Sequence, residues 1–74
     1  MNKERRTKIS TIIENINIIK DSLQEVLDDE QFSFDNMPEN LQYSSRGETS
    51  QEAIDYMEEA IEHLENAIEQ LEYI

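Results

Sequence analysis

The sequence has 74 residues with one glycine, one proline and no cysteine, which allows one small domain and excludes a disulfide framework or a thiolate zinc site. Its 18 acidic and six basic residues give a net charge of -12, so nucleic acid and anionic membranes are poor partners and a basic protein surface is favoured. No apolar run approaches the roughly 20 residues of a membrane span, and the charged N-terminus does not open a signal peptide. We therefore expect a soluble cytoplasmic protein that forms a single domain over residues 1–74.

The first predicted element is a long helix over residues 3–33. Apolar residues recur there at helical spacing through about five turns. They are Ile9, Ile12, Ile13, Ile16, Ile19, Leu23, Val26 and Leu27. This apolar face is wider than the seam of a two-stranded coiled coil, so it can contact more than one neighbouring helix.

A connecting loop is expected over residues 34–46, with a short helical turn near 38–42 because Pro38 suits the first position of such a turn. Ser45 and Glu48 have the spacing of a capping box that opens the next helix. Two interpretations of the loop stay open. In one, four apolar side chains plug the end of the helix pair: Phe32, Phe34, Met37 and Leu41. In the other, the loop is a contact site that presents Asp35, Asn36, Glu39 and Arg46.

A second helix is expected over residues 47–74, where the seven-residue repeat QEAIDYM, EEAIEHL, ENAIEQL ends in EYI. The predicted core positions of the repeat are Ile54, Met57, Ile61, Leu64, Ile68 and Leu71. Three small residues follow one edge of that core, at Ala53, Ala60 and Ala67. Small side chains at these positions let another helix approach closely.

Charge is placed unevenly around the second helix. One side carries an acidic band, which we define as Glu52, Asp55, Glu58, Glu59, Glu62, Glu65, Glu69 and Glu72. The other side carries no carboxylate, and with one exposed residue of the first helix it forms what we call the uncharged flank: Ile18, Tyr56, His63 and Gln70. We expect the acidic band to bind a partner and the uncharged flank to mediate self-association or to bind a partner helix.

These patterns predict an all-α fold, an antiparallel two-helix hairpin of coiled-coil type that dimerises into a four-helix bundle. Two helices in contact along one seam leave half of each apolar face in water, which favours a homodimer. In the antiparallel hairpin, we expect two residues that lie opposite each other on the two helices to have numbers that sum to about 80. Lys8 then lies near Glu72, and Arg5 lies near the C-terminal carboxylate. The basic N-terminus would then act as an electrostatic clasp.

The segment FDNMPENLQ-x-S-x-RGE, followed by EEAI-type heptads, resembles a largely uncharacterised group of small acidic proteins of Firmicutes and their phages. The resemblance covers nearly the whole chain. It implies a hairpin fold and a mobile-element origin, and hence the host cytoplasm as the location if a phage encodes the protein. It supplies neither a site nor an activity.

The chain lacks the residues that catalysis needs. His63 is the single histidine, no cysteine accompanies it, and the one glycine cannot form a phosphate-binding loop or a calcium loop. Acids four residues apart are more typical of a solvated helix face than of a metal site. We therefore expect no enzymatic activity, no cofactor and no bound metal.

Two functions remain. The first is an inhibitor that presents a DNA-like carboxylate surface to a host nucleic-acid-binding or defence protein. The second is a structural or regulatory adaptor that binds a partner helix through the uncharged flank. Salt distinguishes them, because screening weakens binding between exposed charges.

Overall fold

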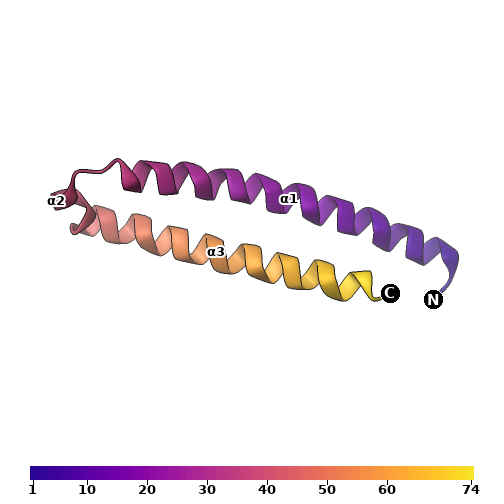
Figure 1. The fold of residues 1–74 in the computed structure, drawn as a ribbon. Coiled ribbons are helices and arrows are strands. Elements are labelled where there is room, and N and C mark those ends of the chain that lie inside the picture. The colour runs from indigo at the N-terminus through magenta and orange to yellow at the C-terminus, as the bar shows by residue number, and fades with distance from the viewer.

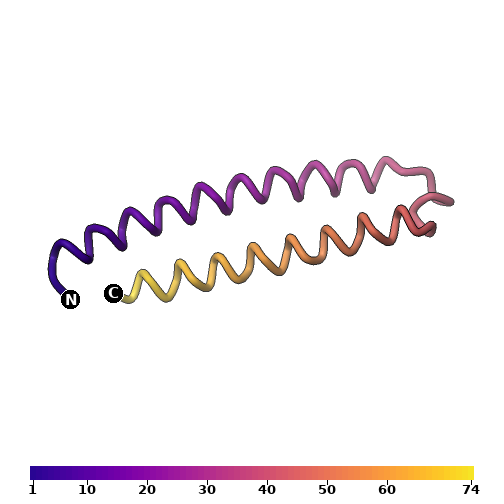
Figure 2. Tube along the Cα trace, turned by 180° about the vertical axis from the view of Figure 1, so that it is seen from behind, coloured from indigo at the N-terminus to yellow at the C-terminus, as the bar shows by residue number.

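The computed structural model describes residues 1–74 and contains three helices, α1 (Lys3–Asp35), α2 (Glu39–Gln42) and α3 (Ser45–Glu72). The all-helical prediction is confirmed, since no strand is present. α1 and α3 lie side by side and run in opposite directions, so both chain termini lie at one end of a rod and α2 lies at the other (Figures 1 and 2). The Cα atoms extend over 58 × 15 × 12 Å. Neither long helix has a stretch apolar enough to cross a membrane.

Both ends of α1 are capped by asparagine. Asn2 Oδ1 accepts a hydrogen bond from the backbone N–H of Arg5 at 2.8 Å. At the other end, Asn36 donates through its backbone N–H to the carbonyls of Phe32 and Phe34, and its Nδ2 donates to Phe32 O at 2.8 Å. Because Asn36 satisfies these terminal carbonyls, α1 ends at Asp35, two residues later than the sequence pattern indicated.

α3 begins at Ser45, two residues earlier than expected, and its N-cap is Ser44. The predicted capping box of Ser45 and Glu48 is therefore wrong. Ser44 makes no side-chain cap hydrogen bond either, because its hydroxyl donates to the carbonyl of Leu41 in α2. The serine thus ties α2 to the start of α3.

Gly47 lies buried in the first turn of α3, where α2 crosses it. A Cβ atom at Gly47 would overlap the backbone carbonyl of Gln42, so a glycine is required for this close approach. The Gln42 side chain in turn holds the end of α1, with Nε2 donating to Phe34 O at 3.1 Å and to Met37 O at 3.3 Å. Glycine and glutamine together fix the path of the connection.

The side chains at this end divide between the two interpretations of the loop. Phe34, Met37 and Leu41 are half-buried, as expected for a plug that covers the end of the core. Phe32, which was predicted to join them, is exposed on the outside of α1. The reason is helical geometry, since Phe32 and Phe34 are two residues apart and point in directions that differ by about 200°.

The core is one row of side chains between α1 and α3. The buried apolar residues are Leu27, Ile54, Ile61 and Ile68. Half-buried neighbours extend this row along both helices: Ile9, Ile13, Ile16, Leu23, Met57, Leu64 and Leu71. Near α2 the row ends in a polar contact, where the buried Ser50 Oγ donates to Glu30 Oε1 at 3.2 Å.

The register of the two helices agrees with the expected sum of about 80, because Ser50 meets Glu30. The clasp built on that register is wrong. Lys8 Nζ lies 3.7 Å from Glu4 on its own helix, and no ion pair joins the N-terminal residues to α3. Arg6 instead lines a shallow depression together with Leu71 and Glu72. The heptad row of α1 that holds Arg6 and the buried Leu27 faces α3, and the row of Lys8 does not.

Candidate partner-binding surfaces

α1 carries a second apolar row that α3 does not cover. Ile12, Ile19 and Val26 are 47%, 58% and 55% exposed, and we call them the Ile-Val row. At 100° per residue they lie between about 60° and 100° around α1 from the buried Leu27. The row therefore runs along one side of the contact between α1 and α3 rather than on the back of the helix.

The depressions on the rod show which row of α3 lies beside the Ile-Val row. Ser33, one heptad after Val26, lines a depression together with Arg46 and Thr49 of α3. Arg46 is one heptad before Ala53, the first member of what we call the alanine row, Ala53, Ala60 and Ala67. The Ile-Val row and the alanine row thus follow the same side of the rod, which we call the apolar face.

The opposite side of the rod is polar and acidic. Ser10 of α1 lines the other depression together with Glu72 of α3. Ser10 begins a row of neutral polar residues spaced by heptads, Ser10, Asn17, Gln24 and Gln31. Glu72 ends the row of Glu58 and Glu65. Charge is therefore concentrated away from the apolar face.

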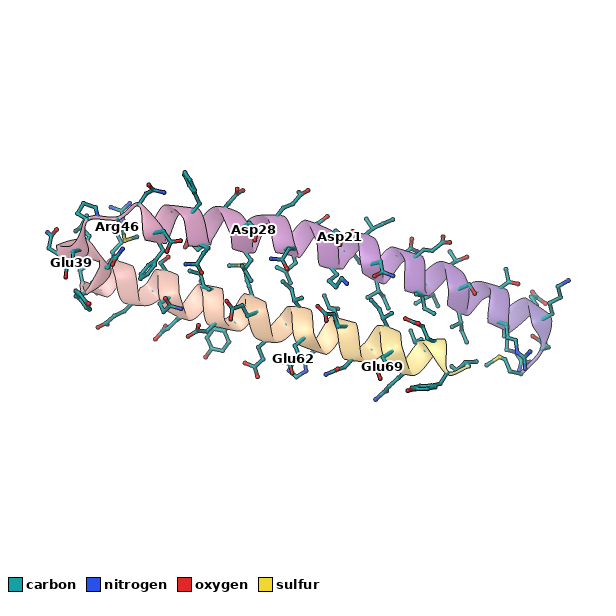
Figure 3. All side chains as sticks on the ribbon, in the orientation of Figure 1. Asp21, Asp28, Glu39, Arg46, Glu62 and Glu69 are labelled. Atoms are coloured by element: carbon teal, nitrogen blue, oxygen red, sulfur yellow. The ribbon has the colours of Figure 1, made fainter.

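Every residue of the acidic band is exposed. Only Glu59 has a basic group close by, with Oε1 3.8 Å from Nε2 of His63. Figure 3 shows Glu62 and Glu69 on the side of α3 that faces away from α1. The other seven carboxylates of the band have no cation within 4 Å, so their charge is free to act on a partner.

The uncharged flank divides in the structure. Tyr56 is 72% exposed, and His63 and Gln70 are exposed beside it on the outer side of the alanine row. Ile18 is 64% exposed but lies nine residues before Leu27, a rotation of about 180°, and so sits on the back of α1. The structure therefore does not place Ile18 on one surface with Tyr56.

The four polar residues of the proposed contact loop have different surroundings. Asp35 accepts a hydrogen bond from Gln31 Nε2 at 2.9 Å within the last turn of α1, and Asn36 caps that helix. Glu39 and Arg46 are exposed at the α2 end of the rod (Figure 3). Arg46 has no carboxylate within 4 Å.

The sequence indicated that the apolar face of α1 is too wide for one partner helix to cover. It did not indicate that the Ile-Val row is the part that α3 leaves exposed. The structure brings no three His, Asp or Glu side chains together as a metal site. No family model matches the chain, and no curated protein or solved structure gives a significant match.

Proposed function

We propose that this protein is a non-catalytic binding protein whose acidic band occupies the basic surface of a nucleic-acid-binding protein. The observation that carries the proposal is the set of seven exposed carboxylates of the band with no cation within 4 Å. The resemblance to phage and Firmicutes proteins suggests the setting, a mobile element that inhibits a host nucleic-acid-binding or defence protein.

Charge density supports a DNA-like surface. α3 carries nine acidic residues from Glu48 to Glu72 and no basic residue over that range. Its 28 residues span about 42 Å at 1.5 Å per residue, which gives about one negative charge per 5 Å. One strand of DNA carries one charge per roughly 3.4 Å and the duplex one per roughly 1.7 Å. Two copies of α3 together reach about one per 2.5 Å, between the strand and the duplex.

Affinity capture from a host-like bacterial lysate tests this function. The test variant replaces four acids of the band by glutamine, at Glu58, Glu62, Glu65 and Glu69. The control removes the same number of charges from α1 by amide replacement of Glu14, Asp21, Glu25 and Asp28. We expect the test variant to lose a partner that the wild type and the control retain, and about 0.5 M NaCl to release that partner. Equal capture by both variants would assign the band to solubility alone.

A second candidate is the helical adaptor, which the exposure of Tyr56 favours. A large aromatic side chain in water beside the alanine row offers an anchor for a partner helix. Under this function, Tyr56→Ala abolishes capture, whereas the glutamine variant retains it in about 0.5 M NaCl.

We also propose that the helix pair is a stable antiparallel hairpin that acts as a dimer in a four-helix bundle. The single chain exposes 5769 Å², about 1,000 Å² more than the roughly 4,800 Å² expected for a folded monomer of this mass. A standard interface buries about 800 Å² on each partner. The excess surface is thus of the size that a dimer interface covers.

A further inference from the structure

We infer that two copies pack through their apolar faces with the two α1 helices antiparallel, about a two-fold axis that passes at the level of Ile19 and Ala60. The inference rests on the proposed dimer and specifies its interface. The steps that carry it are the symmetry of two apolar rows and the placement of two opposite charges.

The Ile-Val row is symmetric about its middle residue. In an antiparallel pair centred on Ile19, each residue of one α1 lies opposite the residue of the second α1 whose number brings the sum of the two to 38. Ile19 then meets Ile19 of the second copy, and Ile12 meets Val26 of the second copy. Each exposed side chain of the row thereby gains an apolar neighbour, with none left over.

The alanine row has the same centre. Ala60 lies level with Ile19, since the numbers at one level of the rod sum to about 80, as Ser50 and Glu30 show. One two-fold axis therefore relates both rows of one copy to the same rows of the second copy. About this axis, Ala53 meets Ala67 of the second copy. Alanine at these positions allows the two α3 helices to approach at the short end of the usual interaxial range of 8–10 Å.

Charge favours this arrangement over the alternatives. The row of α1 next to the Ile-Val row is exposed and consists of Lys8, Asn15, Ser22 and Asp29. Its two charged members have opposite signs and lie at opposite ends. In the antiparallel pair, Lys8 lies one residue, about 1.5 Å, from the level of Asp29 of the second copy, so the two side chains can pair. The same pair recurs on the other side of the axis. In its own chain, Lys8 has only the exposed Glu4 at 3.7 Å.

A second copy also suits this face because each chain carries a net charge of -12, which opposes approach through the acidic side. The apolar face carries no member of the acidic band. An axis parallel to the rod would instead place α1 on α3 of the second copy. Lys8 would then lie level with the C-terminal turn of α3, and its pairing with Asp29 would be lost.

Charge reversal tests the arrangement by sedimentation equilibrium. Lys8→Asp and Asp29→Lys each create two like-charge pairs in the dimer, so we expect each to raise the dissociation constant about tenfold at low salt. The double variant exchanges the charges at positions 8 and 29 and so restores both opposite-charge pairs. We expect its dissociation constant to return to within about twofold of the wild-type value. A double variant as weak as the single variants overturns the antiparallel arrangement.

Cysteine cross-linking tests the axis itself, because the chain has no cysteine. We expect Ile19→Cys to form an intermolecular disulfide on mild oxidation, since the two sulfurs face each other at the axis. Ile18→Cys, on the back of α1, is the control: its two copies still form the non-covalent dimer but stay without a disulfide under the same oxidation. Equal cross-linking of the two variants, or none in either, overturns the proposed axis.

A wild-type chain that sediments as a monomer at micromolar concentration overturns the dimer and with it this interface. In that case α3 alone carries about one charge per 5 Å, and the lysate capture still tests the acidic band because its variants change α3 of a single chain. Failure of the capture, conversely, leaves the interface to be decided by the charge reversals and the cysteine variants.

Discussion

Ser50 Oγ donates to Glu30 Oε1 at 3.2 Å, and this is the one side-chain hydrogen bond that joins α1 to α3. Both residues occupy heptad positions that hold apolar side chains elsewhere in the core. A single buried polar contact in an otherwise apolar seam is a device that fixes register, because a shifted pairing leaves polar groups unsatisfied.

We predict that Ser50→Ala lowers the free energy of unfolding by about 1 kcal/mol, since the Glu30 carboxylate loses its donor at a half-buried position. Urea unfolding followed by circular dichroism measures the change. Thr49→Ala is the matched control, because the exposed Thr49 hydroxyl bonds only to Ser45 O in its own helix. Equal losses of unfolding free energy in the two variants would show that the hydrogen bond between Ser50 and Glu30 does not contribute to stability.

Gly47→Ala should destabilise the protein by more than about 2 kcal/mol, because the added Cβ forces the backbone of α2 away from α3. Helix propensity alone predicts the opposite sign, a gain of about 1 kcal/mol. Thermal unfolding gives the sign directly. Ser45→Ala, an exposed change in the same helical turn, serves as control and should be close to neutral. A stabilised Gly47→Ala variant would contradict the close approach.

Ile54→Val should cost about 0.5–1.5 kcal/mol, since Ile54 is 1% exposed and the lost methyl leaves a small cavity. The same substitution at the exposed Ile18 should change the unfolding free energy by less than about 0.5 kcal/mol. Urea midpoints of the two variants at equal protein concentration make the comparison. A larger loss at Ile18 would mean that the back of α1 is covered in solution.

Salt should stabilise the protein, because carboxylates of the acidic band repel one another without cations to offset them. We expect the thermal midpoint to rise by several degrees as NaCl increases to about 0.5 M. The four-glutamine variant of the band should start at a higher midpoint and show a weaker salt dependence. A salt response unchanged by those substitutions would indicate that the repulsion lies elsewhere in the chain.

The two long helices could be predicted from the sequence because the apolar periodicity is sustained and no glycine or proline interrupts it. The rotation of α1 about its own axis could not be predicted from the sequence. Its apolar face spans Leu27 on one side and Ile19 on the other, and periodicity does not say which of these rows meets α3. Because of the same uncertainty, Lys8 was predicted to lie near Glu72, whereas the structure has Arg6 there.

The connection shows a second limit of sequence reasoning. Ser44 and Ser45 are both good N-caps, and their order in the sequence does not choose between them. The position of the N-cap depends on α2, because the Leu41 carbonyl accepts a hydrogen bond from the hydroxyl of Ser44. The need for glycine at position 47 likewise depends on how close Gln42 comes in space. The acidic band, by contrast, was visible in the sequence because it follows heptad spacing.

Both termini lie at the same end of the rod (Figure 1), and this placement gives a simple optical test. Fluorophores on the N-terminus and C-terminus of one chain are neighbours. In the antiparallel dimer, the labelled ends of the two copies lie at opposite ends of a particle about as long as the 58 Å rod. In a parallel dimer all four ends meet. Energy transfer between singly labelled copies therefore reports polarity directly, and a tag on either terminus leaves the middle of the acidic band free.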